Sequence, residues 1–333
     1  MVKKLAGGIL GNQFMANLGC WFNRHRPLVL LYHGVTDHKS FPGIENYHGK
    51  HISATDFQRQ IRWLKKHFKI VSLKEMENNL EAAVDQPLCA LTFDDGYKNN
   101  FDQAFPILQT EAVTATFFLT GNFIEKRQPL WTDRLEFAIN HCEQLNLTLN
   151  FAGQQQVFSL RRPHEKISAN IVINRYLKHC SGKTRLFQLR EIEEKNNLVF
   201  SFETAPNYSP LSWTEIKIMS RAGMIFGNHT LNHPILSQLS SAEQEKEIYQ
   251  SQKLIAGRLG TVSHFAYPNG QSGDWDVETL RILRSLGWRY AWTTNPRRIR
   301  PAKEIPLLLP RLTIQAHHDF NIFRALVSSL VLR

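Results

Sequence analysis

The 333-residue sequence is poor in cysteine, with four in all and none close to another. Cys20, Cys89, Cys142 and Cys180 form no C-x-x-C pair, which excludes a zinc knuckle and the dense disulfide framework of small secreted domains. We expect four unpaired thiols, a pattern that favours a reducing compartment.

Apolar runs long enough to cross a bilayer are also lacking. The N-terminal stretch 1–20 has a basic start, but Asn12, Gln13 and Asn17 interrupt it, so it is a poor secretory signal and too polar to span a membrane. The last residues, FNIFRALVSSLVLR, are apolar with two arginines. They favour a terminal helix docked on the core, with a helix lying on a membrane surface as the alternative. We expect a cytoplasmic protein or one peripheral to the inner membrane face.

Acidic residues are outnumbered. The chain has 29 Asp and Glu against 40 Lys and Arg, a formal net charge of +11. Such a surface attracts anions, among them nucleic acid, anionic lipid headgroups and acidic glycans. The basic residues are thinly spread and no nucleic-acid-binding motif is present. We therefore expect a generally basic surface without a specific nucleic-acid partner, and the sequence leaves the oligomeric state open.

What the sequence does contain is an alternation of buried strands and amphipathic helices. The run PLVLLYHGV (27–35) is continuous and apolar, as expected of a parallel strand covered on both faces. Apolar residues in the following segment, 52–68, recur at helical spacing. Further strands are predicted at 69–73, 89–97, 115–121, 224–229, 263–270 and 289–294, and further helices at 73–83, 99–111, 214–222, 241–259 and 277–286. This alternation predicts the α/β class and a (β/α) barrel, distorted or incomplete, with seven or eight strands.

The alternation breaks between about residues 124 and 212. Charged helical patterns replace it at 164–180 and 185–197. We predict a helical insertion packed beside the barrel. The expected organisation is an N-terminal extension at 1–26, a main domain at 27–316 that contains the insertion, and a C-terminal helix at 317–333.

Polar side chains follow the predicted strands where each strand ends. His33 follows the first strand, Asp94 and Asp95 follow a second, and His229 and His233 follow a later one. The carboxyl ends of parallel strands meet at one edge of a sheet, so these groups should share one face of the barrel.

This set has the composition of a catalytic metal site. Two adjacent carboxylates repel each other unless a cation is present. The spacing of His229 and His233 could place both imidazoles on one side of a helical turn. An Asp-Asp pair alone is usually a solvated turn, and a lone H-x-x-x-H is usually accidental. Together they predict two histidines and one carboxylate around a divalent cation with open positions.

Three motifs of the sequence resemble those of a known family. TFDDGY (92–97) and GNHTLNHP (227–234) resemble the first two motifs of the NodB-type polysaccharide deacetylases, which are also carbohydrate esterases, and FAYPNG (265–270) resembles the third. The phrases YHGV, LSWTEI and LPR (309–311) are similar to those of members found in bacterial surface-polysaccharide gene clusters. The resemblance covers about 27–314 apart from the insertion, and it implies that the main domain is a NodB homology domain.

The resemblance implies a role for each matching residue. Asp94 would be the general base, and Asp95, His229 and His233 would hold the metal. Zn²⁺ is the expected ion, with Co²⁺, Ni²⁺ and Fe²⁺ as alternatives that the ligands also accept. The implied reaction is metal-assisted hydrolysis of an N-acetyl group on an amino-sugar-containing glycan, with the backbone N–H of Tyr97 stabilising the oxyanion.

The sequence departs from the family pattern at two places. Ala266 stands where many relatives have an arginine that tunes the base, and Arg311 stands near the position of their late Leu-x-His acid. We expect His33 to be the acid, as a divergent branch that deacetylates poly-N-acetylglucosamine implies. His317 and His318 are weaker candidates. Arg311 could replace the missing arginine from another direction at the substrate site.

Aromatic residues near these motifs are candidates for sugar binding. Tyr267, Pro268 and Trp292 could line a groove for pyranose rings, although packing in the core is as good an interpretation of each. Trp131 and Asp133 could reach over the same groove from the insertion.

Three other functions stay open. The enzyme could act on a lipid-linked or nucleotide-linked amino sugar instead of a polymer. The chain could also be a catalytically inactive carbohydrate-binding barrel, but such a barrel has no need of the base Asp94. Net charge alone supports nucleic-acid binding, with weak and salt-sensitive affinity as its signature.

Overall fold

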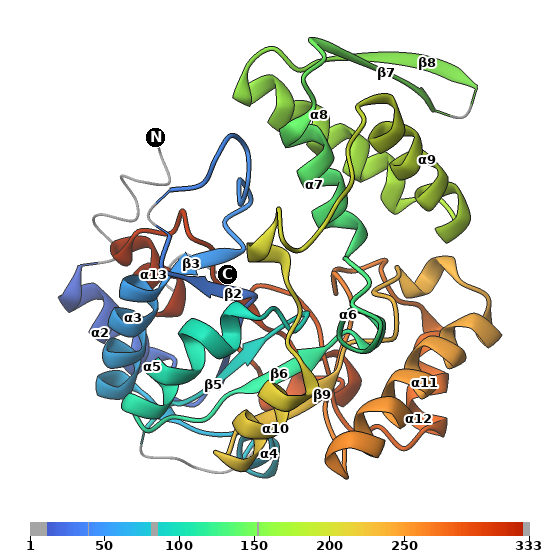
Figure 1. Ribbon diagram of the computed structural model, residues 1–333. Coiled ribbons are helices and arrows are strands. Elements are labelled where there is room, and N and C mark those ends of the chain that lie inside the picture. The colour runs from blue at the N-terminus through green and yellow to red at the C-terminus, as the bar shows by residue number, and fades with distance from the viewer. Residues whose placement is uncertain (1–11, 39, 81–85, 152, 329–333) are drawn as a thin grey trace.

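The structure is a computed structural model that describes residues 12–38, 40–80, 86–151 and 153–328. Figure 1 shows a parallel sheet surrounded by helices, with a second group of helices and a hairpin standing over one end of it.

The sheet has eight parallel strands. Its order is β11-β10-β9-β6-β5-β1-β12, with β4 pairing β5 off this path. Their bounds are β1 (Leu28–Tyr32), β4 (Lys69–Ile70), β5 (Leu88–Phe93), β6 (Thr116–Leu119), β9 (Ile225–Asn228), β10 (Phe265–Ala266), β11 (Ala291–Trp292) and β12 (Leu312–Thr313). The prediction of a distorted, incomplete (β/α) barrel is confirmed.

One short segment links the two ends of the sheet. Leu309 forms a parallel bridge with Trp292 of β11, and Leu312 of β12 pairs Leu30 of β1. The segment 309–313 therefore pairs with β11 on one side and β1 on the other and closes the sheet.

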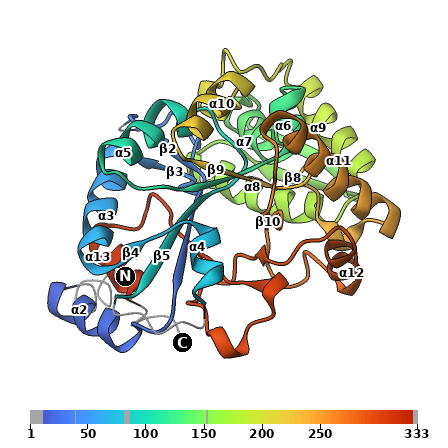
Figure 2. The ribbon, with the colours of Figure 1, turned by 90° about the horizontal axis from the view of Figure 1, so that it is seen from below.

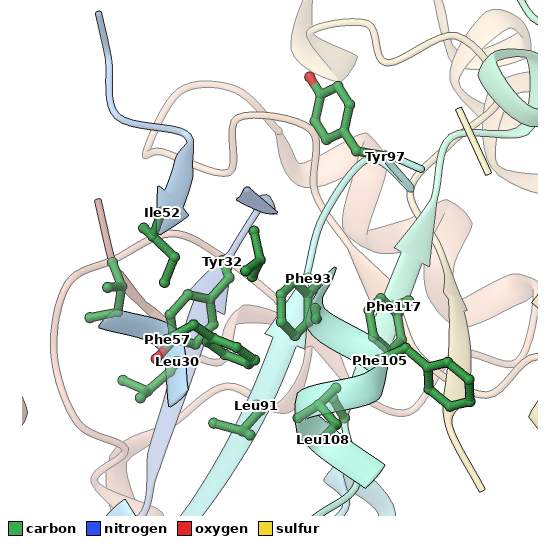
Figure 3. Packing of buried hydrophobic residues seen from close by; sticks show 14 of the residues in the cluster. Leu30, Tyr32, Ile52, Phe57, Leu91, Phe93, Tyr97, Phe105, Leu108 and Phe117 are labelled. Carbon is green, nitrogen blue, oxygen red and sulfur yellow. The ribbon is translucent and has the colours of Figure 1, made fainter. Parts of the chain in front are cut away.

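The central strands form because continuous apolar runs need cover on both faces. Every residue of β1 and β5 is buried. Figure 3 shows Phe93 of β5 between Tyr32 of β1 and Phe117 of β6, with ring centroids 5.4 and 4.8 Å apart. A short second sheet of β2 (Gly34–Thr36) and β3 (His51–Ser53) extends from the carboxyl end of β1.

The helices agree closely with the predicted ones. The helix expected at 241–259 is found with those bounds. The helix expected at 99–111 begins with a π-helical turn (Asn100–Ala104). The helix expected at 73–83 already ends at Asn78, where Asn79 caps it; residues 81–85 lie outside the described residues. Around the sheet lie α2 (Gln13–Phe22), α3 (Ala54–His67), α4 (Leu73–Asn78), α5 (Phe105–Thr110), α6 (Gly121–Glu125), α10 (Trp213–Arg221), α11 (Ser241–Leu259), α12 (Val277–Ser285) and α13 (Phe320–Val327).

The insertion is not purely helical, contrary to the prediction. It contains α7 (Trp131–His141), β7 (Asn146–Phe151), β8 (Gln154–Ser159), α8 (Pro163–Lys178) and α9 (Gly182–Lys195), and β7 and β8 form an antiparallel hairpin. In β7 exposed and buried residues alternate, because only one face of the hairpin covers the insertion's own apolar cluster. That two-residue period was the signal missed.

The terminal segments lie on the barrel. In α13, Phe323 and Val327 are buried in the main core, so the favoured interpretation of a docked helix holds for the described part of the C-terminus. Residues 329–333 lie outside the described residues. The four cysteines are free, as expected. Within the described ranges, no helix is long and apolar enough to span a membrane.

Candidate active site

Four predicted residues meet at the carboxyl edge of the sheet. Asp94 and Asp95 follow β5, and His229 follows β9. Asp95 Oδ1 lies 3.6 Å from His229 Nε2 and 3.4 Å from His233 Nε2. His229 Nε2 also lies 3.8 Å from Asp94 Oδ2. The tertiary structure thus brings together two carboxylates and two imidazoles that are far apart in the sequence.

Three of these residues fit a divalent cation. The ligand atoms of Asp95, His229 and His233 all lie within 4.8 Å of one another. Asp95 Oδ1 is buried without a hydrogen-bond partner among the described residues, which is unfavourable for a carboxylate oxygen unless a cation faces it. Ligands about 2.1 Å from a tetrahedral ion lie about 3.4 Å apart, close to the distances found.

The protonation states also suit a metal. Burial lowers the pKa of His229 below its ordinary value and lowers that of His233 to about 4, which leaves both rings neutral with free lone pairs. Burial raises the pKa of Asp95, and the nearby histidines offset this only in part. The side chains around Asp95 therefore do not fully balance its negative charge, and a cation would.

The backbone of the TFDDGY turn sets the direction of the Asp95 carboxylate. Asp95 has φ 74° and Gly96 has φ 93°, both in the left-handed region. A Cβ at Gly96 would lie 2.9 Å from Leu119 Cδ2 and 3.0 Å from Ile124 Cδ1. Only glycine satisfies both the positive φ and the close approach of these two side chains.

The histidine pair lies on a loop, so the predicted helical turn is wrong. Thr230 and His233 have φ of 64° and 55°, which a right-handed helix does not allow. Glu247 of α11 holds the loop by accepting hydrogen bonds from the N–H groups of Leu231 (3.1 Å) and Asn232 (2.8 Å). Sequence reasoning missed Glu247, since nothing in an exposed helical pattern distinguishes it from other glutamates.

A backbone carbonyl fixes the ring of His229. Its Nδ1 lies 2.8 Å from the carbonyl oxygen of Ala266. Because a carbonyl only accepts, Nδ1 carries the hydrogen and Nε2 keeps the lone pair that faces Asp95. Residue 266 thus orients the histidine through its backbone carbonyl, and this contact does not depend on its side chain.

Arg311 binds Asp94 with both ends of its guanidinium group. Nη1 and Nη2 donate to Oδ1 and Oδ2 at 2.7 and 2.8 Å, Nη1 also donates to Thr92 Oγ1 (3.2 Å), and Nε donates to the carbonyl of Thr293 (3.1 Å). Burial raises the pKa of Asp94, but the charge and hydrogen bonds of Arg311 together with the charges of His229 and His33 more than offset this, and the pKa lies below its ordinary value. Arg311 is fully buried and its hydrogen bonds go to the protein. Arg311 thus pairs with Asp94 as expected of a replacement for the missing arginine, whereas its full burial contradicts the expected contact with substrate.

His33 stands beside the two carboxylates. It follows β1, and its pKa reflects burial, which lowers it, and the charges of Asp95 and Asp94, which raise it. The pKa is lowered overall, so the ring is neutral near pH 7. His317 is exposed and packs edge-on against His318, with ring centroids 4.8 Å apart.

A buried polar network supports Tyr97 from the insertion. Asp133 of α7 is fully buried and accepts a hydrogen bond from the Tyr97 hydroxyl at 2.8 Å and another from the Lys50 ammonium. Burial lowers the pKa of Lys50, but the charge and hydrogen bond of Asp133 together with the charges of Glu136 and Asp95 more than offset this and raise the pKa overall. Glu136, one turn on, accepts from the Tyr208 hydroxyl. Asp133 was singled out from the sequence, whereas Lys50 and Glu136 were missed; the i,i+3 spacing of the two acids was the available signal.

The backbone of Tyr97 is free to bind something else. No acceptor for its N–H is found in the part of the chain that the structure describes. Its ring is fully buried, so any contact with a substrate is through the backbone.

The three other predicted sugar contacts lie in the core. Trp292 and Tyr267 are 0% and 1% exposed, and the Tyr267 hydroxyl donates to the carbonyl of Leu307 at 2.8 Å. Pro268 is buried too. The prediction that these faces line a groove is wrong. Trp292 packs with side chains from several strands of the barrel, and Tyr267 packs in the cluster between the sheet and helices α11 and α12.

A cavity of about 500 Å³ lies between the insertion and the barrel. Trp131 and Arg185 line it from the insertion, and Leu231, Pro234 and Lys246 line it from the barrel. Asn232 and Pro234, on either side of His233 in the sequence, line it too. Its size is in the range of ligand pockets.

The comparisons agree on one family. The family model for polysaccharide deacetylase matches residues 81–291. The chain is 23% identical over 163 residues to YxkH of Bacillus subtilis, which carries a polysaccharide deacetylase name, and 37% identical over 79 residues to a chitooligosaccharide deacetylase of Azorhizobium caulinodans. These matches cover 45% and 22% of this chain and 55% and 36% of the relatives, so the chain spans about half or less of each.

The fold comparison covers more of the chain. The Streptococcus pyogenes deacetylase PplD, solved in complex with acetate, superimposes with a TM-score of 0.58 at 19% identity, over 90% of this chain and 96% of that one. This likeness shows that the two chains share a fold.

Proposed function

Because the chain belongs to the polysaccharide deacetylase family, we propose that it removes N-acetyl groups from amino sugars of a bacterial glycan, with a divalent cation as cofactor. The observation that carries the proposal is the convergence of Asp94, Asp95, His229 and His233 in one buried pocket. Asp95, His229 and His233 would hold the cation, which in our proposal is Zn²⁺.

The cation, when bound, would supply a Lewis acid for the acetamide carbonyl and lower the pKa of a water. Asp94 is the base that takes a proton from the attacking water, and Arg311 keeps it ionised and fixes its orientation. The N–H of Tyr97 donates to the oxyanion that forms on the carbonyl oxygen. The C–N bond then breaks as the amine nitrogen takes a proton from the protonated form of His33. The proton that Asp94 removed from the water returns to the His33 ring, and acetate and a free amino sugar leave.

Neighbouring sugar units need a place beside the reacting one. We propose that they extend into the cavity between the insertion and the barrel, where Lys126 and Lys246 offer ammonium groups and Leu231 and Pro234 offer apolar contacts. The insertion would then select the glycan, since Trp131 and Arg185 form one wall, with the Arg185 guanidinium 4.8 Å from the Trp131 ring centroid.

The proposal is tested with the purified protein, stripped by a chelator and reloaded with Zn²⁺. Acetate and free amine are measured on N-acetylglucosamine oligosaccharides, lipid-linked amino sugars and nucleotide sugars. We expect release from the oligosaccharides by the reloaded protein alone. Release only from the lipid-linked or nucleotide-linked compounds would instead support those substrates.

Asp94→Asn is the decisive variant. It should bind Zn²⁺ as the wild type does and lose deacetylation, because an amide cannot take the proton. Asp102→Asn, in an exposed ion pair with Lys98, is the matched control and should stay active. Undiminished turnover by Asp94→Asn would remove Asp94 as the base. A metal-loaded wild type that binds glycans but releases no acetate would point to an inactive carbohydrate-binding barrel.

A further inference from the structure

Helix α2 carries an apolar stripe on its outer face. Phe14, Leu18, Trp21 and Phe22 are 74%, 37%, 57% and 66% exposed. Their spacing of four, three and one residues puts them on one side of the helix. Figure 2 shows α2 on the outside of the molecule, at the corner where α13 also lies.

The inner face of α2 is small by contrast. Ala16, Gly19 and Cys20 are the buried residues of the helix. A surface helix normally turns its large apolar residues inward. In α2 the small residues face inward and the large apolar residues face outward. Packing within the described part of the molecule therefore does not explain why this short helix carries three aromatic side chains. A single exposed apolar residue such as Val277 is ordinary, but a contiguous stripe marks a contact surface.

The charged residues in the chain segment that carries the stripe are all basic. The first 36 residues contain no Asp or Glu, and the first acid of the chain is Asp37. The Arg24 guanidinium lies 4.8 Å from the Trp21 ring centroid, and Arg26 is exposed two residues on. Arg324 of the adjacent α13 donates to Gln13 at 3.1 Å. Aromatic side chains bordered by arginines are the composition that binds the interface of an anionic bilayer.

The stripe lies at the opposite edge of the sheet from the metal pocket. Gln13 Nε2 lies 3.0 Å from His67 Nε2, in the last turn of α3, and β4 begins two residues later. The contact is thus at the amino ends of the strands, whereas Asp95 is at their carboxyl ends. A surface bound to α2 leaves the pocket open.

We propose that α2 docks the protein on an anionic lipid surface, with Phe14, Trp21 and Phe22 entering the interface and the arginines facing headgroup phosphates. A second copy of the chain is a poorer occupant, because a two-fold contact would bring the arginines of both copies together. This proposal does not depend on the deacetylase activity.

The test uses the full chain and co-sedimentation with vesicles of phosphatidylcholine alone or of equimolar phosphatidylcholine and phosphatidylglycerol. We expect binding to the anionic vesicles that weakens as salt is added. The triple variant Phe14→Ser, Trp21→Ser, Phe22→Ser should bind at least about tenfold more weakly, since each ring loses interfacial burial. Phe187→Ser is the matched control, because Phe187 is 65% exposed on α9 of the insertion.

Two further variants keep the test decisive if the triple variant fails to fold. Arg24→Glu with Arg26→Glu should abolish the preference for anionic vesicles. Trp21→Phe should still sediment but lose part of the fluorescence quenching by brominated lipid, because it preserves the apolar stripe and removes its tryptophan.

Three results would overturn the proposal. One is absence of binding to anionic vesicles, and another is equal binding by the wild type and the arginine variant. The third is a wild-type dimer that becomes a monomer in the triple variant without vesicle binding, which would assign the stripe to a second copy.

Discussion

Asp133→Asn tests the buried network that joins the insertion to the candidate active site. Asp133 is fully buried, and its two oxygens accept hydrogen bonds from Lys50 and from the Tyr97 hydroxyl. Asparagine has nearly the same shape and still offers one carbonyl oxygen. The substitution therefore removes one negative charge and turns one of the two acceptors into an N–H donor.

The size of the effect follows from what remains around Lys50. Removing one partner of a buried ion pair lowers the free energy of unfolding by about 3–5 kcal/mol. The charges of Glu136 and Asp95 still favour the charged form of Lys50, and the Lys50 side chain is 16% exposed. We therefore expect the free energy of unfolding to fall by about 3 kcal/mol, the lower end of this range. With about 2.1 cal/mol/K of unfolding entropy per residue, 333 residues give about 0.7 kcal/mol/K, and Tm should fall by about 4 °C.

Thermal unfolding of four proteins measures this pair. The wild type, Asp133→Asn, Lys50→Met and the double variant form a cycle in which we expect a coupling of about 2 kcal/mol. Glu191→Gln is the control in the same insertion, because its pair with Lys195 is partly exposed and should be worth less than about 0.5 kcal/mol. A Tm for Asp133→Asn within about 1 °C of the wild type, or additive single effects, would refute the reasoning.

Three further predictions concern the pocket. His229→Ala and His233→Ala should each lose bound metal because each removes a ligand, and full occupancy by elemental analysis would refute the assignment. His33→Ala should lower kcat at least as much as His317→Ala, since His33 lies beside the carboxylates; the reverse order would move the acid to the C-terminal segment. Glu247→Gln should weaken Zn²⁺ affinity about tenfold or more by loosening the histidine loop, and an unchanged Kd in a competition titration would contradict that role.

Parts of the fold could be predicted because they depend on local patterns. The buried runs of β1 and β5 and the periodicity of α11 are visible in short windows of sequence, and the structure has them at the predicted places. The hairpin of β7 and β8 was missed because its alternation stands among charged helical patterns, and only packing against the insertion's own cluster selects the strand.

Some features of the candidate site could likewise be predicted from the sequence, and others could not. Asp94, Asp95, His229 and His233 could be brought to one edge by reasoning about strand ends alone. The conformation of the histidine loop could not, because it depends on hydrogen bonds to a distant helix. The aromatic contacts were mistaken for a similar reason: a tyrosine or tryptophan after a strand has the same local pattern whether it faces a groove or the core.

Arg311 could be predicted in part from the sequence, but its contact with Asp94 depends on the tertiary structure. The sequence pointed to it as the replacement for a missing arginine, but 217 residues separate it from Asp94. Only the closing segment 309–313, which pairs with strands at both ends of the sheet, brings its guanidinium to both oxygens of the carboxylate.

Side-chain chemistry and short-range periodicity are local properties, so the amino-acid sequence was enough to predict which residues could bind a cation and which strand ends they follow. The contacts around these residues depend on the tertiary structure, which pairs Arg311 with Asp94 and Asp133 with Tyr97 and Lys50. It also turns the aromatic stripe of α2 outward. The contacts of Asp94 and Tyr97 join residues that are 36 to 217 positions apart in the sequence, and no local pattern contains them.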